Sequence, residues 1–137
     1  MRLSSGTVRR RRLLLVDPDA VYCAGLEEPL EMALWSVHAH ADVPSALAWL
    51  ADNPSQDIDA IWCEATLRDV RAEELIARVR ELRPGLPALV VSSAQDGSAM
   101  ASNAIRKFSK RDTGAAVRWL LALEPDKELD RDYLPYS

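Results

Sequence analysis

The chain has 137 residues, of which 48% are hydrophobic and 28% are charged. This balance is typical of one soluble globular domain that is long enough to bury a core. The formal net charge of −4 argues against a general nucleic-acid binder, which needs an excess of lysine and arginine on one face. No apolar run approaches the roughly 18 residues of a membrane span, so we expect neither nucleic acid nor a membrane among the direct partners.

Two kinds of segment alternate along the chain. Short apolar runs are typical of strands buried on both faces, and longer stretches have the apolar spacing of helices. Strands are predicted at residues 12–16, 35–40, 58–64, 87–93 and 105–110. Helices are predicted at residues 19–34, 43–53, 71–83 and 112–123, with at best a short helix within 94–104. Five strand–helix repeats predict an α/β fold, in which helices cover both faces of a parallel sheet.

The sequence defines the apolar side of the predicted first helix less clearly than that of the third. In the first, Asp19 has the position of an N-cap, and Pro29 is expected to kink the helix or end it early. Its predicted apolar side consists of Val21, Ala24, Leu26, Leu30 and Met32. The third is clearly amphipathic and should end at Pro84-Gly85. Its predicted inward residues are Leu75, Ile76, Val79 and Leu82.

Polar residues follow four of the predicted strands. Asp17, Glu64, Ser92 and Lys110 each stand at the end of a different strand. Ligands of parallel sheets bind beyond the carboxyl ends of the strands, so these side chains should share one edge. The stretch "LLLVDPDAV" delivers Asp17, Pro18 and Asp19 to that edge.

The cysteines and histidines give no sign of a metal site. Cys23 and Cys63 belong to no CxxC pair, and His38 and His40 alternate on one predicted strand without a third ligand. We interpret the histidines as structural and the cysteines as reduced, small apolar residues. Reduced thiols suit the cytosol, so we expect a cytoplasmic protein without metal or other cofactor.

Four motifs, taken in order, resemble a response-regulator receiver domain of bacterial two-component signalling. They are "RRLLLVDPDA", "DIDAIWCEATLRDVRAEEL", "PALVVSS" and "FSKRD". The resemblance covers residues 11–123 and implies a doubly wound five-stranded parallel sheet with strand order 2-1-3-4-5. Residues 1–10 are then expected to be a flexible basic flank and residues 124–137 a C-terminal tail.

The resemblance also assigns roles at the shared edge, and the chain departs from several of them. Asp17 takes the first place of the family's acidic pair, but Pro18 takes the second, where a Mg²⁺ ligand is expected. Glu64 takes the place of the phosphoacceptor aspartate and is one methylene longer. Ser92 matches the switch serine or threonine, and Lys110 matches the site lysine. Without a phosphoryl group, Lys110 is expected to neutralise Asp17 and Glu64.

Further departures agree with an atypical receiver, or pseudo-receiver. Arg68 and Arg111 replace family prolines, and Lys107 takes the place of the switch aromatic. Phe108 is adjacent, but strand alternation should point it to the other face. The sequence therefore predicts a protein that is not an enzyme and that acts, independently of phosphorylation, by binding another protein, with a homodimer also considered. Glu64 as a mimic of a phosphorylated aspartate is a further hypothesis.

Two other functions compete with this interpretation. Asp17-Pro18-Asp19 also fits the DxD signature of haloacid-dehalogenase-type phosphatases, with Asp17 as nucleophile and Asp19 as general acid or base. The second is a receiver that is still phosphorylated at a non-standard carboxylate, either Glu64 or Asp69. The basic run Arg9–Arg12 could contact nucleic acid, but a solvated flank is the simpler interpretation.

Overall fold

The computed structural model describes residues 10–68, 70–93 and 105–123. The strands of this part of the chain are β2 (Arg11–Val16), β3 (Trp35–His40), β4 (Ala60–Glu64), β5 (Ala88–Ser92) and β6 (Ile105–Ser109). The helices are α1 (Ala20–Met32), α2 (Val43–Asp52), α3 (Ala72–Leu82), the 3-10 turn η1 (Lys110–Asp112) and α4 (Thr113–Leu121). Apart from η1, which has no counterpart among the predicted elements, all bounds agree within two residues with those predicted. The short helix predicted within 94–104 lies outside the described residues.

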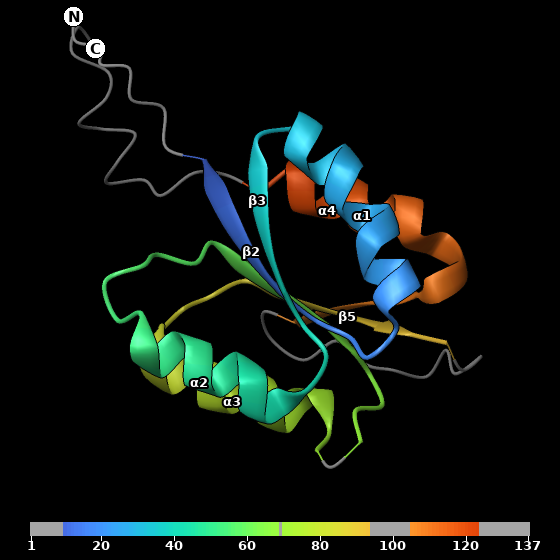
Figure 1. Cartoon of the computed structure of the whole chain (residues 1–137). Helices are drawn as coiled ribbons and strands as arrows, with labels where there is room; N and C mark the ends of the chain where they lie inside the picture. The colour runs from blue at the N-terminus through green and yellow to red at the C-terminus, as the bar shows by residue number, and fades with distance from the viewer. Residues whose placement is uncertain (1–9, 69, 94–104, 124–137) are drawn as a thin grey trace, which may run out of the picture.

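The five strands form one parallel sheet in the order β3-β2-β4-β5-β6. Counted along the described chain, this order is 2-1-3-4-5. Helices α1 and α4 lie on one face of the sheet, and α2 and α3 lie on the other (Figure 1). The predicted doubly wound α/β fold is confirmed. Among the described residues, no helix is both long and apolar enough to cross a membrane.

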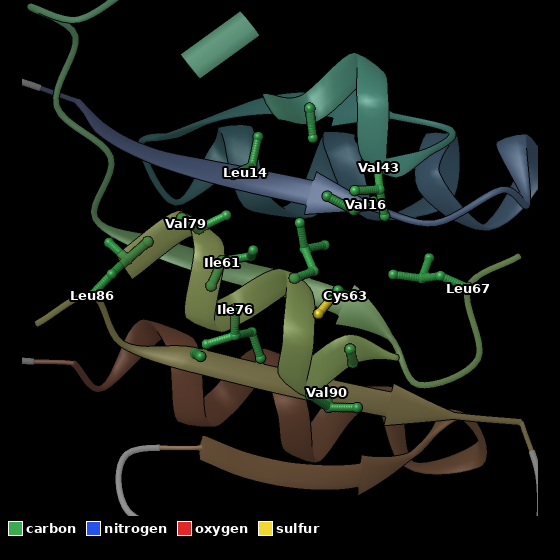
Figure 2. Packing of buried hydrophobic residues seen from close by; sticks show 14 of the residues in the cluster. Leu14, Val16, Val43, Ile61, Cys63, Leu67, Ile76, Val79, Leu86 and Val90 are labelled. Atoms are coloured by element: carbon green, nitrogen blue, oxygen red, sulfur yellow. The ribbon is translucent and has the colours of Figure 1, made fainter. Parts of the chain in front are cut away.

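Strand residues alternate between two separate clusters of buried side chains. Leu14, Val16, Ile61, Cys63 and Val90 face α2 and α3, where Val43, Ile76 and Val79 meet them (Figure 2). Their neighbours along the same strands, Leu13, Leu15, Trp62, Leu89 and Val91, face α1 and α4. This alternation buries both faces of the sheet, which is why the strands appear in the sequence as uninterrupted apolar runs.

The predicted apolar side of α1 is wrong in part. The helix buries Cys23, Leu26 and Leu30, whereas Val21 is 82% exposed, Met32 is 78% exposed and Ala24 is exposed as well. Residues two apart lie about 200° around a helix, so Val21 and Met32 point away from the sheet when Cys23 and Leu30 point toward it. In α3 the prediction holds for Leu75, Ile76 and Val79. Leu82 ends that helix and is 47% exposed.

Pro29 does not end α1, which continues to Met32. A proline inside a helix leaves the carbonyl four residues earlier without its usual donor, here the carbonyl of Gly25. Both Gly25 and Pro29 are exposed, so water can hydrogen-bond to that carbonyl. The predicted stop signal at the end of α3 does act, because Gly85 adopts the left-handed φ of 78° that glycine tolerates.

Candidate functional site

The predicted site residues gather at the carboxyl edge of the sheet. Asp17 follows β2, Glu64 ends β4, Ser92 ends β5 and Lys110 follows β6. The register places Glu64 beside Val91 and Ser92 beside Ser109, so the strand ends are level with one another. This is the edge at which ligands of parallel α/β sheets bind.

Lys110 joins the two buried carboxylates of this edge. Its Nζ lies 3.0 Å from Asp17 Oδ2 and 2.8 Å from Glu64 Oε1. Asp17 is only 2% exposed and Glu64 only 5%. The other Asp17 oxygen, Oδ1, accepts a hydrogen bond from the backbone N–H of Asp19 at 2.8 Å. One ammonium thus stands between two carboxylates, and we call Asp17, Glu64 and Lys110 the charge cluster.

The cluster keeps Lys110 charged. Burial lowers the pKa of the ammonium, but its hydrogen bonds to Glu64 and Asp17 outweigh that effect, and the pKa is raised above its ordinary value. A raised pKa means that the contribution of Lys110 to stability is fully present below its ordinary pKa and is lost only in strongly basic solution. At neutral pH Lys110 is therefore a fixed cation between the Asp17 and Glu64 side chains.

Pro18 and Asp19 do not contribute further oxygens to the cluster. Pro18 is exposed and has no polar side-chain atom. Asp19 caps α1, as predicted: its Oδ1 accepts from the N–H groups of Val21 and Tyr22, both at 3.1 Å.

The Mg²⁺ ion that the family resemblance implies does not suit these residues. Asp17 and Glu64 each direct an oxygen at the Lys110 ammonium, where a divalent cation would need them. Pro18 supplies no side-chain ligand, and Asp19 Oδ1 is engaged at the helix start. In the described ranges, no group of three or more His, Cys, Asp or Glu side chains is arranged to hold a metal ion.

Two residues beside the cluster were not singled out in the sequence as site residues. The Tyr22 ring lies under the ammonium, with Lys110 Nζ 4.3 Å from its centroid. The Tyr22 hydroxyl is 2.8 Å from Thr113 Oγ1, which in turn donates to the Lys110 carbonyl at 2.8 Å. Their signals in the sequence are weak: Tyr22 lies in the first turn after Asp19, and Thr113 stands three residues after Lys110.

The neighbouring part of β6 also differs from the family pattern. Lys107 pairs with Glu73 of α3 at 2.7 Å. Phe108 points to the opposite face, as expected, and its ring centroid lies 6.4 Å from that of Trp119. The place of the switch aromatic is thus held by a lysine that is already paired. Arg68 and Arg111 are both exposed.

Comparison with known proteins finds similarity in structure. No family sequence model matches the chain, and no curated protein sequence matches it. The signal receiver domain of an HD domain-containing protein from Pseudomonas fluorescens matches 81% of this chain and 94% of its own length, with a TM-score of 0.65 and 27% identity. A response regulator from Chloroflexus aurantiacus matches 82% of this chain and 98% of its own length, with a TM-score of 0.64 and 27% identity.

A third match extends the likeness at low sequence identity. A response regulator receiver domain protein from Clostridium thermocellum covers 81% of this chain and 94% of its own length, with a TM-score of 0.66 at 14% identity. All three are receiver domains or response regulators, and the two more similar ones share about a quarter of their residues with the chain. The chain therefore has the receiver (CheY-like) fold of two-component response regulators.

Proposed function

We propose that this chain is a signalling protein of two-component type that works without phosphorylation, by binding another protein. The observation that carries the proposal is the charge cluster: Lys110 Nζ contacts both Asp17 Oδ2 and Glu64 Oε1, at 3.0 and 2.8 Å. The lysine thereby occupies the edge at which a receiver would hold its metal ion and phosphoryl group, and it offsets one of the two negative charges there.

The chemistry of phosphoryl transfer supports the same conclusion. Transfer to a carboxylate needs an attacking oxygen in line with the leaving group and cations that neutralise the transferring phosphoryl. The Glu64 carboxylate is paired with Lys110, and Pro18 cannot replace the missing metal ligand. Both requirements are therefore unmet at the same place in the fold.

The partner is proposed to bind where β6 and α4 meet. This placement follows by analogy with receiver domains, whose last strand and flanking helices form a common output surface. The exposed Arg106 on β6 has its guanidinium over the rings of Phe108 and Trp119, at 5.7 and 5.9 Å. Arginine next to aromatic rings is enriched where proteins bind each other. A second copy of the chain is the other partner considered for this surface.

The phosphatase alternative finds less support. Its nucleophile would be Asp17, which is buried against Lys110, and its general acid or base would be Asp19. Asp19 Oδ1 already accepts two backbone N–H groups at the start of α1, which favours the role of a helix cap over that of a general acid or base. Magnesium-dependent hydrolysis of a generic phosphate ester that is lost on Asp17→Asn would restore this alternative.

Acetyl phosphate tests the proposal directly. The full chain is incubated with acetyl phosphate and Mg²⁺, beside a receiver domain known to accept the phosphoryl group, and intact masses are measured. We expect the second protein to gain a phosphoryl group and this chain to remain unmodified. The chain should also capture the same partner from its host with and without this treatment.

A phosphoryl group on Glu64 or on Asp69 would overturn the proposal. Glu64→Gln serves as the matched variant, because a mass gain that persists without the Glu64 carboxylate places the acceptor elsewhere. Asp69, the other carboxylate predicted in this loop, lies outside the described residues and would be identified by peptide mapping.

A further inference from the structure

Tyr22 contacts the Lys110 ammonium directly and is linked to the Lys110 backbone through Thr113. Its ring faces the ammonium, with Nζ 4.3 Å from the centroid. Its hydroxyl reaches the Lys110 backbone through Thr113, because Thr113 Oγ1 is 2.8 Å from the Tyr22 oxygen and donates to the Lys110 carbonyl at 2.8 Å. A threonine hydroxyl carries one proton, so the Tyr22 hydroxyl is the donor to Thr113.

These contacts hold the start of α4, which has no side-chain cap of its own; the preceding η1 turn is capped by Ser109, whose Oγ accepts from the Arg111 N–H at 3.1 Å. The N-cap residue Asp112 makes no side-chain hydrogen bond to the first turn. The far end of the helix is held separately, since the Arg11 guanidinium donates to the carbonyl of Leu123 at 2.8 Å. The first turn of α4 therefore depends on Tyr22 and Thr113 more than a capped helix would.

We infer that Tyr22, Thr113 and the Lys110 carbonyl form a latch that couples the charge of Glu64 to the position of α4. The coupling itself rests on the geometry alone, and its role in signalling rests on the proposed function. This coupling makes the charge cluster a regulatory element. Any change in the Glu64–Lys110 contact also changes the position of α4, which forms part of the proposed partner surface.

The coupling has a direct physical path. When Glu64 loses its charge, Asp17 is the one anionic partner among the described residues that the ammonium keeps, and the ammonium shifts toward it. Lys110 is the first residue of η1, which leads into α4, so a shift of Lys110 also moves its carbonyl away from Thr113. Ala116 and Leu120 of α4 pack in the same cluster as Leu26 of α1, and a displaced α4 changes the α1–α4 layer as a whole.

Hydrogen exchange on the full chain tests the latch. The measured quantity is the protection of the first amides of α4 that donate within the helix, at Ala116 and Val117. We expect Glu64→Gln to lower this protection about fivefold in the wild-type background. In a Thr113→Val background the same change should have an effect of less than about twofold, because the path is already cut. Equal effects in the two backgrounds would overturn the inference.

Matched variants separate the latch from a general loss of stability. Tyr22→Phe keeps the ring under Lys110 and removes the hydroxyl alone, so it should abolish the coupling as Thr113→Val does. If Thr113→Val does not fold, Tyr22→Phe takes its place in the exchange experiment. Thr113→Ser keeps the hydroxyl and should keep the coupling. If Tyr22→Phe leaves the coupling intact, the latch is refuted.

A control outside the latch has the same bond length. Ser45 Oγ and His40 Nδ1 form a 2.8 Å hydrogen bond beside the other layer of helices, and Ser45→Ala removes it. The effect of Glu64→Gln on α4 should remain about fivefold in this background. A phosphoryl group on Glu64 in the acetyl phosphate assay would refute the proposed function and leave the exchange result unchanged, so the two failures are distinguishable.

Discussion

Lys107, in the middle of β6, and Lys110, directly after that strand, pair with glutamates at similar distances but in different surroundings. Lys107 Nζ lies 2.7 Å from Glu73, whose side chain is 48% exposed. Lys110 Nζ lies 2.8 Å from Glu64, whose side chain is 7% exposed, and it also contacts the buried Asp17. Water screens the first pair and is largely excluded from the second. The comparison teaches that burial of the carboxylates, more than the distance between Nζ and the carboxylate oxygen, decides how much each lysine contributes to the free energy of unfolding.

Removing the buried lysine should have the largest effect. Lys110→Met keeps an unbranched side chain of similar length but leaves Asp17 and Glu64 buried without a cation. We expect the free energy of unfolding to fall by about 3 kcal/mol, the lower end for a broken buried pair because Lys110 itself is partly exposed. Urea unfolding followed by tryptophan fluorescence measures the change.

Glu64→Gln is the control for this prediction. It leaves one carboxylate opposite one ammonium, so the loss should be only about 1 kcal/mol. Equal losses from Lys110→Met and Glu64→Gln would contradict the comparison, because they would mean that the cluster is screened by solvent like the Lys107–Glu73 pair.

Much of the fold could be predicted from the sequence, because its strands and α3 have clear patterns. Strands buried on both faces form apolar runs, and the polar outer face of α3 identifies its inner residues Leu75, Ile76 and Val79. Helix α1 lacks this contrast, since Val21, Ala24 and Met32 are apolar but exposed. Its rotation is set by packing against the sheet, which no local pattern encodes.

The candidate site could be predicted less completely. The strand ends bring Asp17, Glu64 and Lys110 together in any sheet of this topology, and the Lys110 pairs follow from that. The hydrogen bond between Tyr22 and Thr113 joins residues 91 positions apart. It depends on how α1 and α4 are rotated on their shared face, so the sequence alone did not indicate it.

His38 and His40 extend the comparison to half-buried groups at which burial outweighs the effect of any nearby carboxylate. Both stand near Trp49, with the His38 ring stacked on it at 4.7 Å. Burial lowers the pKa of both histidines. At His38 the nearby charge of Arg12 lowers the pKa further. At His40 the neighbouring His38 lowers the pKa further, whereas Asp42 raises it. At Lys110, in contrast, the carboxylates outweigh burial.

The lowered pKa values predict a smaller, pH-dependent loss of stability. Below about pH 6.5 the unfolded chain binds more protons at these histidines than the folded chain does. Their contribution is therefore present above about pH 6.5 and is lost as the pH falls through the folded pKa values. Urea unfolding at about pH 7.5 and about pH 5.5 should show a smaller decrease for His38→Gln than for wild type. Parallel decreases would mean that other groups set the pH dependence.

The exposed pair should show the smallest effect. Lys107→Met makes the same substitution as Lys110→Met, three residues earlier, and removes a contact between side chains that are 24% and 48% exposed. We expect a loss of about 0.5 kcal/mol, since such pairs gain little over hydration. In about 1 M NaCl the loss should disappear, because the screening length falls to about 3 Å, whereas the loss from Lys110→Met should persist. If salt abolished both losses, or neither, burial would not be what distinguishes the two lysines.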